Sequence, residues 1–431
     1  MLARYGVQPV FGKIFPLFRI LKEAAGILIR SGELVAAQSI NQWITKRRPT
    51  ELEAYFALSA FAYKQGDRRA ARSHLINGIR NRAFATYPVA DESAARILHV
   101  RGVQNSVYML GKSRNGDYKV KLRGGNFSDI YLIDRNQHSI ISYFILDQNI
   151  LSDEKVPEFD IVLNLISDPD VEAQSLQSLA VFLARHPDVP VINQPGDVLA
   201  TTRDNNCRRL SGVKGIRFPR TTRMVMTNIT PQDCRQFLET HHYSFPVLVR
   251  ETGTHFGRSF RKVENFDTFM RYVSKCRGDE IYVIQYQNSM FSDGIFRKMR
   301  VFIVDGNIYP AICHFDTIWN VHGNNRREVM LNHSWMMEHE QAFMGDCESY
   351  IGNEAFRRLK QLREIIGLDF FGVDFTILND GDVLVYEVNP AMRHSYDHAD
   401  DFPYLLPYLK QITTAFGEMV LHKLESRRAS R

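Results

Sequence analysis

Apolar and polar positions alternate with a period of two near the C-terminal end of the chain, in the segment FGVDFTILNDGDVLVYEVNP at residues 371–390. The Asp380-Gly381 pair at its centre favours a two-residue hairpin turn with positive φ at both central positions. Counted outward from that turn, the ladder places Asp374 opposite Glu387. The pattern therefore predicts an antiparallel hairpin in which two carboxylates meet on one face.

Two opposed carboxylates need a partner, because like charges directly opposite each other destabilise a sheet. Side chains alternate between faces, so Asn389 shares the face of Glu387. A hard cation such as Mg²⁺ takes oxygen ligands, usually one or two carboxylates completed by water and substrate phosphates. A solvated face with water or a cationic side chain is the alternative that the hairpin alone leaves open. The other face is expected to carry Phe375, Ile377, Leu384, Tyr386 and Val388.

Helical periodicity and an internal repeat mark the first part of the chain. The segments SGELVAAQ, from Ser31, and QGDRRAAR, from Gln65, align at an offset of 34 residues, which is the period of tetratricopeptide repeats. Two repeats are fewer than such stacks need, so we expect them to lean on the preceding segment FGKIFPLFRILKEAAGILI or on the next domain. An ordinary helical hairpin is the alternative. We assign residues 1–88 to this helical module.

From about Ala90 onward the hydrophobic pattern changes to short apolar runs separated by turns. These runs are SDIYLID, SIISYFIL, FDIVLNLI and VPVINQP, and a helix-like segment, EAQSLQSLAVFLARH, precedes the last of them. This alternation predicts a parallel α/β layer, which we assign to residues 89–200. After Pro195 the strands look antiparallel, and we assign residues 201–425 to a separate α+β domain. Its helices are expected at PQDCRQFLETHH, FDTFMRYVSKC and NEAFRRLKQLREIIG.

Composition narrows the class of protein. The chain has 431 residues, 44% of them hydrophobic, and a formal net charge of +6. Its five cysteines are scattered without CxxC spacing, which favours a reducing cytoplasm over a disulfide framework or a zinc site. Charged residues interrupt the apolar N-terminal stretch, so no membrane segment is expected. The basic residues are spread along the chain, which argues against a nucleic-acid partner.

Two segments have the chemistry of a phosphate site. The loop TGTHFGRS contains Gly253 and Gly257, whose backbone N–H groups can form an anion-binding nest, although an ordinary hairpin loop is the simpler interpretation. Further along, Lys298 and Arg300 share one face of a predicted strand. Phosphate recognition uses such paired cations, and a solvated basic strand edge is the alternative.

These segments, in this order, resemble the ATP-grasp superfamily, which includes D-alanine:D-alanine ligases and glutathione synthetases. The resemblance covers roughly residues 159–400 and is carried by FPVLVRETGTHFGRSF as strand and flap, IYVIQYQ as adenine hinge, RKMRVFIVDG as basic strand, and GVDF with YEVNP as metal-binding hairpin. The run DGIFRKMRVFIVDGNIYPAICHF with WNVHGNN is similar to a less defined group in which tetratricopeptide repeats precede the grasp domain. The resemblance implies an α/β chain: two α+β subdomains clasping ATP, preceded by a Rossmann-like domain and an all-α repeat module.

The resemblance also implies roles for individual residues. Asp374, Glu387 and Asn389 would hold Mg²⁺ against the phosphates of ATP. Arg300 would stabilise the transferring phosphoryl group, with His255 or His314 at the acyl group. The hinge residues would read adenine, and Asp293 would reach the ribose. The nucleotide contacts implied are Arg250, Gly253, His255, Gly257, Arg258, Ser259, Gln285, Tyr286, Asp293 and Lys298.

Two positions depart from the family pattern. Arg250 stands where the family has a lysine at the α-phosphate, and arginine keeps the charge but adds a planar fork of donors. The earlier family lysine falls near Asn205, with Arg203 and Arg208 as substitutes.

The resemblance implies a cytoplasmic Mg-ATP-dependent carboxylate-amine ligase. A carboxylate attacks the γ-phosphate to give an acyl phosphate, and an amine then displaces phosphate. A peptide or protein substrate is expected because helical repeats present concave surfaces. The alternative is a nucleotide-binding scaffold that recruits a protein partner through its repeats. The sequence identifies neither the acid nor the amine, and it leaves open whether the chain forms a homo-oligomer.

Overall fold

Four helices form the N-terminal end of the molecule in the computed structural model, which describes residues 10–91, 93–113, 115–147, 156–254, 259–291, 293–321 and 325–429. They are α1 (Val10–Ser31), α2 (Leu34–Arg47), α3 (Leu52–Lys64) and α4 (Arg68–Asn81). Gly66, at φ +85°, turns the chain between α3 and α4, and Asp67 caps α4 by accepting from the Ala70 N–H. The expected helical module is confirmed, while its tetratricopeptide character stays a prediction.

The helical module shares its core with the sheet that follows. Phe56 of α3 stacks on Tyr108, with ring centroids 4.1 Å apart, and meets Phe144 edge-on at 4.8 Å. One hydrophobic cluster runs from Leu52 and Ile79 into the strands of the next domain. The expectation that the repeats lean on a neighbouring element is therefore confirmed.

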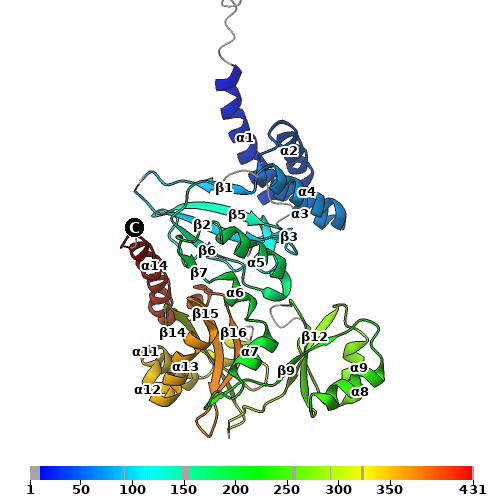
Figure 1. The fold of residues 1–431 in the computed structure, drawn as a ribbon, viewed down its shortest axis with the longest axis vertical. Coiled ribbons are helices and arrows are strands. Elements are labelled where there is room, and N and C mark those ends of the chain that lie inside the picture. The colour runs from blue at the N-terminus through cyan, green and yellow to red at the C-terminus, as the bar shows by residue number, and fades with distance from the viewer. Residues whose placement is uncertain are drawn as a thin grey trace, which may run out of the picture.

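A mostly parallel sheet occupies the middle of the molecule (Figure 1). Its strand order is β1 (Phe84–Tyr87), β5 (Ser139–Ile145), β2 (Arg96–Gly102), β6 (Ile161–Asn164) and β7 (Val191–Ile192). Only β1 is antiparallel to its neighbour. Helix α5 (Pro169–Leu183) connects β6 to β7, and β3 (Val107–Lys112) pairs with β4 (Tyr118–Arg123) in a separate hairpin. The parallel α/β layer is confirmed; its Rossmann-like character is not tested.

The run SDIYLID is not a strand. Residues 128–134 form turns, with Leu132 and Ile133 buried in the core. Asp129, which is 1% exposed, is held by Arg101 at 2.9 Å and Arg135 at 3.1 Å. The apolar residues of the run therefore pack in a turn whose buried carboxylate, Asp129, is paired.

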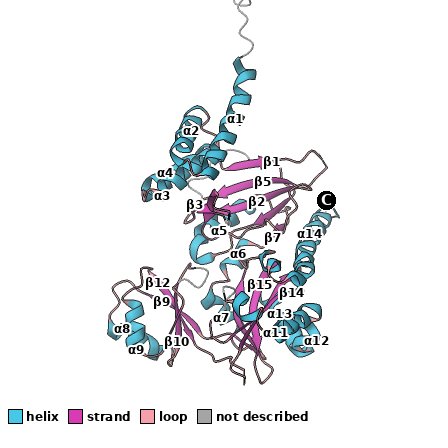
Figure 2. Cartoon of the chain, turned by 180° about the vertical axis from the view of Figure 1, so that it is seen from behind, coloured by secondary structure: helices cyan, strands magenta, loops and turns pink. Residues whose placement is uncertain are grey.

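Two sheets, one antiparallel and one antiparallel except for a parallel edge strand, form the other end of the molecule and lie side by side in both views (Figures 1 and 2). The small sheet has the order β11 (Arg261–Val263), β10 (Val247–Glu251), β12 (Glu280–Gln285) and β9 (Thr221–Val225). Helices α8 (Pro231–Thr240) and α9 (Phe266–Val273) cover one of its faces, burying Val249, Ile281 and Val283 against Leu238 and Phe269. The opposite face, which carries Leu248, Arg250 and Tyr282, looks toward the large sheet.

The large sheet has the order β14 (Asn307–Asp316), β13 (Phe296–Val304), β15 (Phe370–Ile377), β16 (Val383–Asn389) and β8 (Ile216–Arg217). The other elements are α6 (Pro195–Leu199), α7 (Arg203–Leu210), α10 (Arg326–Met330), α11 (Ser334–Gly345), α12 (Cys347–Ile351), α13 (Asn353–Ile366), η1 (Asp397–Asp400), η2 (Pro403–Leu405) and α14 (Leu406–Ala429). The helices expected in PQDCRQFLETHH, FDTFMRYVSKC and NEAFRRLKQLREIIG are confirmed as α8, α9 and α13. Among the described residues, no helix combines the length and apolarity needed to cross a bilayer.

Asn193, directly after β7, joins the parallel sheet to the large sheet. Its side chain accepts from the Asp369 and Phe370 N–H groups, at 2.9 and 3.0 Å, and donates to the Phe370 carbonyl at 2.7 Å. Its own N–H donates to the Asp369 carboxylate at 2.9 Å. Asn193 is 1% exposed, so this junction is buried and fully bonded.

Candidate functional site

The hairpin β15–β16 brings the two predicted carboxylates together, but its turn and its strand register differ from those expected. Asp374 lies opposite Glu387, as predicted. The turn is longer than two residues, since the Leu378 N–H donates to the Asp382 carbonyl. A register shift between Asp374 and Phe375 then compensates for the longer turn.

This bulge corrects part of the predicted face assignment. Leu384 pairs with Thr376, and Val385 pairs with Phe375. Leu384 was expected opposite Ile377 and away from the carboxylates; it lies instead on the face of Thr376 and Asp374. An extra residue in one strand shifts the pairing by one position, and the sequence carries no signal for it.

Asp374 is held by two cations of the neighbouring strand β13. Arg300 lies opposite Asp374 in the ladder and donates to both of its oxygens, at 2.6 and 2.9 Å. The Lys298 Nζ lies 3.5 Å from the same carboxylate. Burial alone would raise the pKa of Asp374, but the two cations hold it at about 2. Asp374 is therefore ionised at neutral pH.

Glu387 pairs with Arg203, the first residue of α7. Burial and the nearby Asp374 act to raise the pKa of Glu387, yet Arg203 and Arg250 keep it below its ordinary value. The Asn389 Nδ2 atom donates to Glu387 at 3.1 Å, and its side-chain Oδ1 atom accepts from the Ala391 N–H at 2.6 Å. Of the two arginines considered as lysine substitutes, Arg203 reaches the site; Arg208 bonds Asn205 at the surface.

Arg250 extends from β10 toward the large sheet into a central pocket. Burial, together with the positive charge of Arg203, lowers its pKa to about 10. Its guanidinium donates to the Thr254 carbonyl in the glycine loop. The central pocket is lined by Ser167, Asp168, Pro169, Asp170, Thr201, Thr202, Arg203, Asn206, Phe218, Arg250, Gly253, Thr254, Tyr282, Glu387, Val388, Asn389 and Pro390.

The pocket thus gathers residues from the two sheets, from α7 and from the loop before α5. Four of the predicted site residues line it: Arg250, Gly253, Glu387 and Asn389. Lys298, Arg300 and Asp374 are not among its lining residues. They occupy the adjoining strands on the same face of the large sheet as Glu387.

Gly253 allows the loop to approach the parallel-sheet domain. Its φ is +63°, and a Cβ at this position would lie 2.9 Å from a Val171 methyl group. Ser259, on the far side of the loop, accepts from the Glu251 N–H at 3.1 Å. The predicted contacts His255, Gly257 and Arg258 lie outside the described residues.

The predicted hinge lies at the end of β12, away from the pocket lining. Gln285 is engaged with Ser244, donating to its carbonyl at 2.9 Å. The Lys262 Nζ atom lies 4.2 Å from the centroid of the Tyr286 ring. The Trp319 ring packs edge-on against the same ring, with centroids 6.2 Å apart. The Asp293 side chain accepts from the Ile295 N–H at 3.0 Å, within its own turn. Roles for these three in binding adenine and ribose stay predictions.

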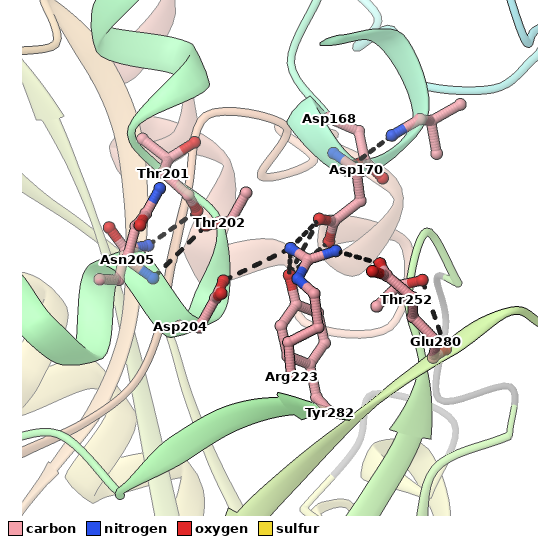
Figure 3. A network of polar contacts seen from close by, with 12 residues as sticks. Asp168, Asp170, Thr201, Thr202, Asp204, Asn205, Arg223, Thr252, Glu280 and Tyr282 are labelled. Carbon is pink, nitrogen blue, oxygen red and sulfur yellow. Dashed lines mark hydrogen bonds and ion pairs between the residues drawn. The ribbon is translucent and has the colours of Figure 1, made fainter. Parts of the chain in front are cut away.

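A network around Arg223 was missed by the sequence analysis (Figure 3). Arg223 of β9 donates to Asp170 at 2.6 Å, to Glu280 at 2.6 Å and to the Tyr282 hydroxyl at 2.7 Å. The Asp204 carboxylate of α7 lies 3.4 Å away. These contacts join the small sheet to α5 and α7. The segments are distant in sequence, so no local pattern could have indicated them.

The oxygen donors at the hairpin fit Mg²⁺. Both carboxylates are ionised and opposed, and Asn389 lies beside Glu387 with its amide nitrogen turned toward that carboxylate. Each carboxylate offers about four acceptor positions, so the bonds from Arg300 and Arg203 leave lone pairs on both. Within the described residues, no three side chains of the types His, Cys, Asp and Glu gather as a metal group. This donor set therefore matches an ion that completes its shell with water and phosphate oxygens.

Comparisons with known proteins give structural matches only. No family profile matches the sequence, and no curated protein matches it. Among solved structures, D-alanine–D-alanine ligase from Bacillus anthracis complexed with ATP is 13% identical, covering 78% of this chain and all of that one at a TM-score of 0.44. VanG D-Ala:D-Ser ligase from Enterococcus faecalis is 11% identical, covering 76% of this chain and 99% of that one at 0.42.

A RimK domain protein of ATP-grasp type from Sphaerobacter thermophilus is 13% identical and has a TM-score of 0.40, covering 74% of this chain and all of that one. In structure the chain is thus similar to two D-alanine-type ligases and to one RimK domain protein of ATP-grasp type.

Proposed function

We propose that this chain is a Mg-ATP-dependent carboxylate-amine ligase that acts through an acyl phosphate. One observation carries the proposal: two ionised carboxylates meet on the large sheet, directly beside a pocket lined by two half-buried arginines, Arg203 and Arg250. Such a constellation suits a polyphosphate with its cation, because the arginines can receive phosphate oxygens while the carboxylates can hold the cation.

The small sheet and α7 supply the nucleotide's cationic contacts. Arg250 of β10 and Arg203 of α7 both line the pocket. Arginine offers a planar fork of donors that matches phosphate oxygens. Leu248 and Ile284 lie on the same sheet face as Arg250 and Tyr282 but nearer the hinge. Phosphates therefore belong at the Arg250 end and the adenine at the Gln285 end.

The large sheet supplies the reacting end. Asp374, Glu387 and Asn389 would hold Mg²⁺, which would neutralise phosphate charge when bound. Lys298 and Arg300 lie beside these ligands, and Arg300 stabilises charge on the transferring phosphoryl group. His314 contacts the acyl group from the neighbouring strand. The chain's part in the chemistry is to position reactants and balance their charge.

The bond changes balance without further reactants. A carboxylate oxygen of the acid attacks the γ-phosphorus, and ADP leaves. The amine then attacks the acyl carbon, phosphate leaves with one oxygen of the acid, and a proton is released. A peptide or protein acid is the substrate class we propose, since the helical module offers a second binding surface.

Phosphate release tests this proposal. Mg-ATP, candidate acids labelled with ¹⁸O in the carboxylate and candidate amines are mixed with the protein. Transfer of ¹⁸O into the released phosphate is expected, because the acid oxygen leaves with it. Turnover without label transfer would contradict the acyl phosphate.

A nucleotide-binding scaffold is the second candidate. The observation favouring it is that Arg300 and Arg203 already neutralise the two carboxylates within the protein. A scaffold would bind Mg-ATP yet release no phosphate with any acid and amine, and its helical module would retain a protein partner.

A further inference from the structure

His314 lies on β14, the edge strand of the large sheet, and its ring contacts Arg326 of α10, outside the sheet. The ring is 3% exposed, and the Arg326 Nη1 atom lies 3.2 Å from its Nδ1 atom. A guanidinium has five N–H donors and no acceptor. Nδ1 must therefore accept, and the proton of the neutral ring must sit on Nε2.

An ion pair with Glu340 of α11 fixes the orientation of Arg326. The Arg326 Nη1 atom donates to one Glu340 oxygen at 2.8 Å, and Nη2 donates to the other. The carboxylate also accepts from the Cys313 N–H at 2.7 Å and from the Tyr404 hydroxyl at 2.7 Å. Arg326 and Glu340 are 2% and 0% exposed. Such a buried ion pair, held at two points, fixes the direction of each member.

The position of His314 places it with the reacting groups. Lys298 lies opposite His314 in the ladder, and Arg300, two residues along β13, lies opposite Asp374. The charged and titratable groups around the ring are Lys298 and Arg300 from β13, Arg326 from α10, Glu340 from α11 and His398 from η1. Burial is the largest cause that lowers the pKa of His314, and the positive charges of Arg326, Lys298 and Arg300 lower it further. The pKa of His314 therefore lies well below its ordinary range. The ring is uncharged at neutral pH.

We propose that His314 is a neutral hydrogen-bond donor, through its Nε2–H, to an oxygen of the acyl group during ligation, and that Arg326, Glu340 and Tyr404 are positioning residues that set its tautomer. The donor role rests on the proposed function. The tautomer and its cause rest on the contacts alone. A neutral donor aimed at an oxygen that gains negative charge stabilises that charge without giving up a proton.

Nitrogen NMR of the whole protein with ¹⁵N-labelled histidine tests the tautomer. The chain has 14 histidines. The His314 signals are assigned as those missing from the spectrum of the His314→Gln variant. The expected pattern for His314 is a protonated Nε2 and an unprotonated Nδ1 that does not change between pH 6 and 8. A proton on Nδ1, or a charged ring at pH 7, would overturn the proposal.

Two variants test the positioning residues. Glu340→Gln loosens the grip on Arg326, so the Nδ1–H tautomer should appear alongside the Nε2–H form. Tyr404→Phe removes one hydroxyl from the network, is the milder change, and should broaden or shift the His314 signals in a folded protein. If the network does not set the tautomer, neither variant changes the His314 signals. Unchanged His314 signals in both variants, each shown to be folded, would therefore overturn the positioning role.

The donor role is tested with Mg-ADP and acetyl phosphate, the simplest acyl phosphate. The Nε2–H signal of His314 should shift when both are added and stay in place with Mg-ADP alone. An unmoved signal, with both ligands shown to bind by calorimetry, would remove His314 from the acyl site. Absence of any nucleotide binding would instead contradict the proposed function and the donor role with it, while the tautomer would still be decided by the unliganded spectrum.

Discussion

Arg250 carries its charge in a partly desolvated pocket beside a second arginine. Its pKa is lowered to about 10 by burial and by Arg203, so an anion between the two would relieve their repulsion. We expect Arg250→Ala to weaken binding of a non-hydrolysable ATP analogue by about 1.5 to 3 kcal/mol, the value of a hydrogen bond to a charged group. Arg250→Lys should keep much of the affinity.

Calorimetric titration of these variants is compared with Arg271→Ala, a change of an exposed arginine on α9. Unchanged affinity in a folded Arg250→Ala protein would place Arg250 outside the nucleotide site. It would also favour a purely structural contact with Thr254.

The ion pair of Asp374 predicts a dependence of stability on pH. The pKa of Asp374 is about 2 in the folded protein against an ordinary value near 3.8, so the folded state binds its proton more weakly than the unfolded state. This stabilisation, about 2 kcal/mol, is fully present above the unfolded pKa and is lost as the pH falls through the folded pKa.

Thermal unfolding of Asp374→Asn between pH 6 and 3 checks this. The variant should be less stable at pH 6, because Arg300 and Lys298 lose their buried partner. The gap from the wild type should narrow toward pH 3. A gap that stays constant with pH would contradict the assigned pKa.

The residues of the hairpin also mark the limit of sequence reasoning. The opposition of Asp374 and Glu387 was predicted correctly, although the turn and the pairing of Leu384 were wrong. Two errors cancelled: the longer turn shifted the ladder by one position and the bulge shifted it back. Alternation predicts faces well within one strand, but a bulge depends on how neighbouring strands twist and pack.

At the scale of elements, two long-range ion pairs organise the pocket. Arg203 comes from α7, Asp170 from α5 and Arg223 from β9, and each reaches a partner in another element. The helices and most strands could be predicted because hydrophobic period and caps are local. The partners in these two ion pairs could not, since the paired residues lie 53 and 184 residues apart in sequence.

Arg223 provides a prediction about the small sheet. Arg223→Gln leaves Asp170, Glu280 and Asp204 without their shared cation and removes the link from β9 to α5 and α7. We expect faster backbone hydrogen exchange in β9 and β12 and a loss of roughly 1 to 2 kcal/mol in stability. The control is Arg217→Gln, which breaks an exposed pair on β8. Equal exchange in both variants would show that the network does not hold the small sheet.

At the scale of the whole molecule, the helical module and the parallel sheet share one core. A chain beginning at residue 90 would expose Tyr108 and Phe144, which Phe56 now covers. We expect that chain to aggregate, and Phe56→Ala in the full chain to cost about 3 to 5 kcal/mol. Size-exclusion chromatography and thermal unfolding measure both. A soluble, cooperatively folded chain from residue 90 that binds Mg-ATP would instead make the module a separable recognition unit.

The shift in melting temperature caused by Mg-ATP tests the nucleotide site most directly, with Glu387→Gln and the exposed α13 variant Glu364→Gln measured beside the wild type. Ligand at 100 times its dissociation constant should stabilise the wild type by about 2.7 kcal/mol. The account predicts a clear rise for the wild type and Glu364→Gln, and little or none for Glu387→Gln, because a carboxylate facing Asp374 is needed to balance the cation. No rise in the wild type at millimolar Mg-ATP, or an equal rise in all three proteins, would contradict it.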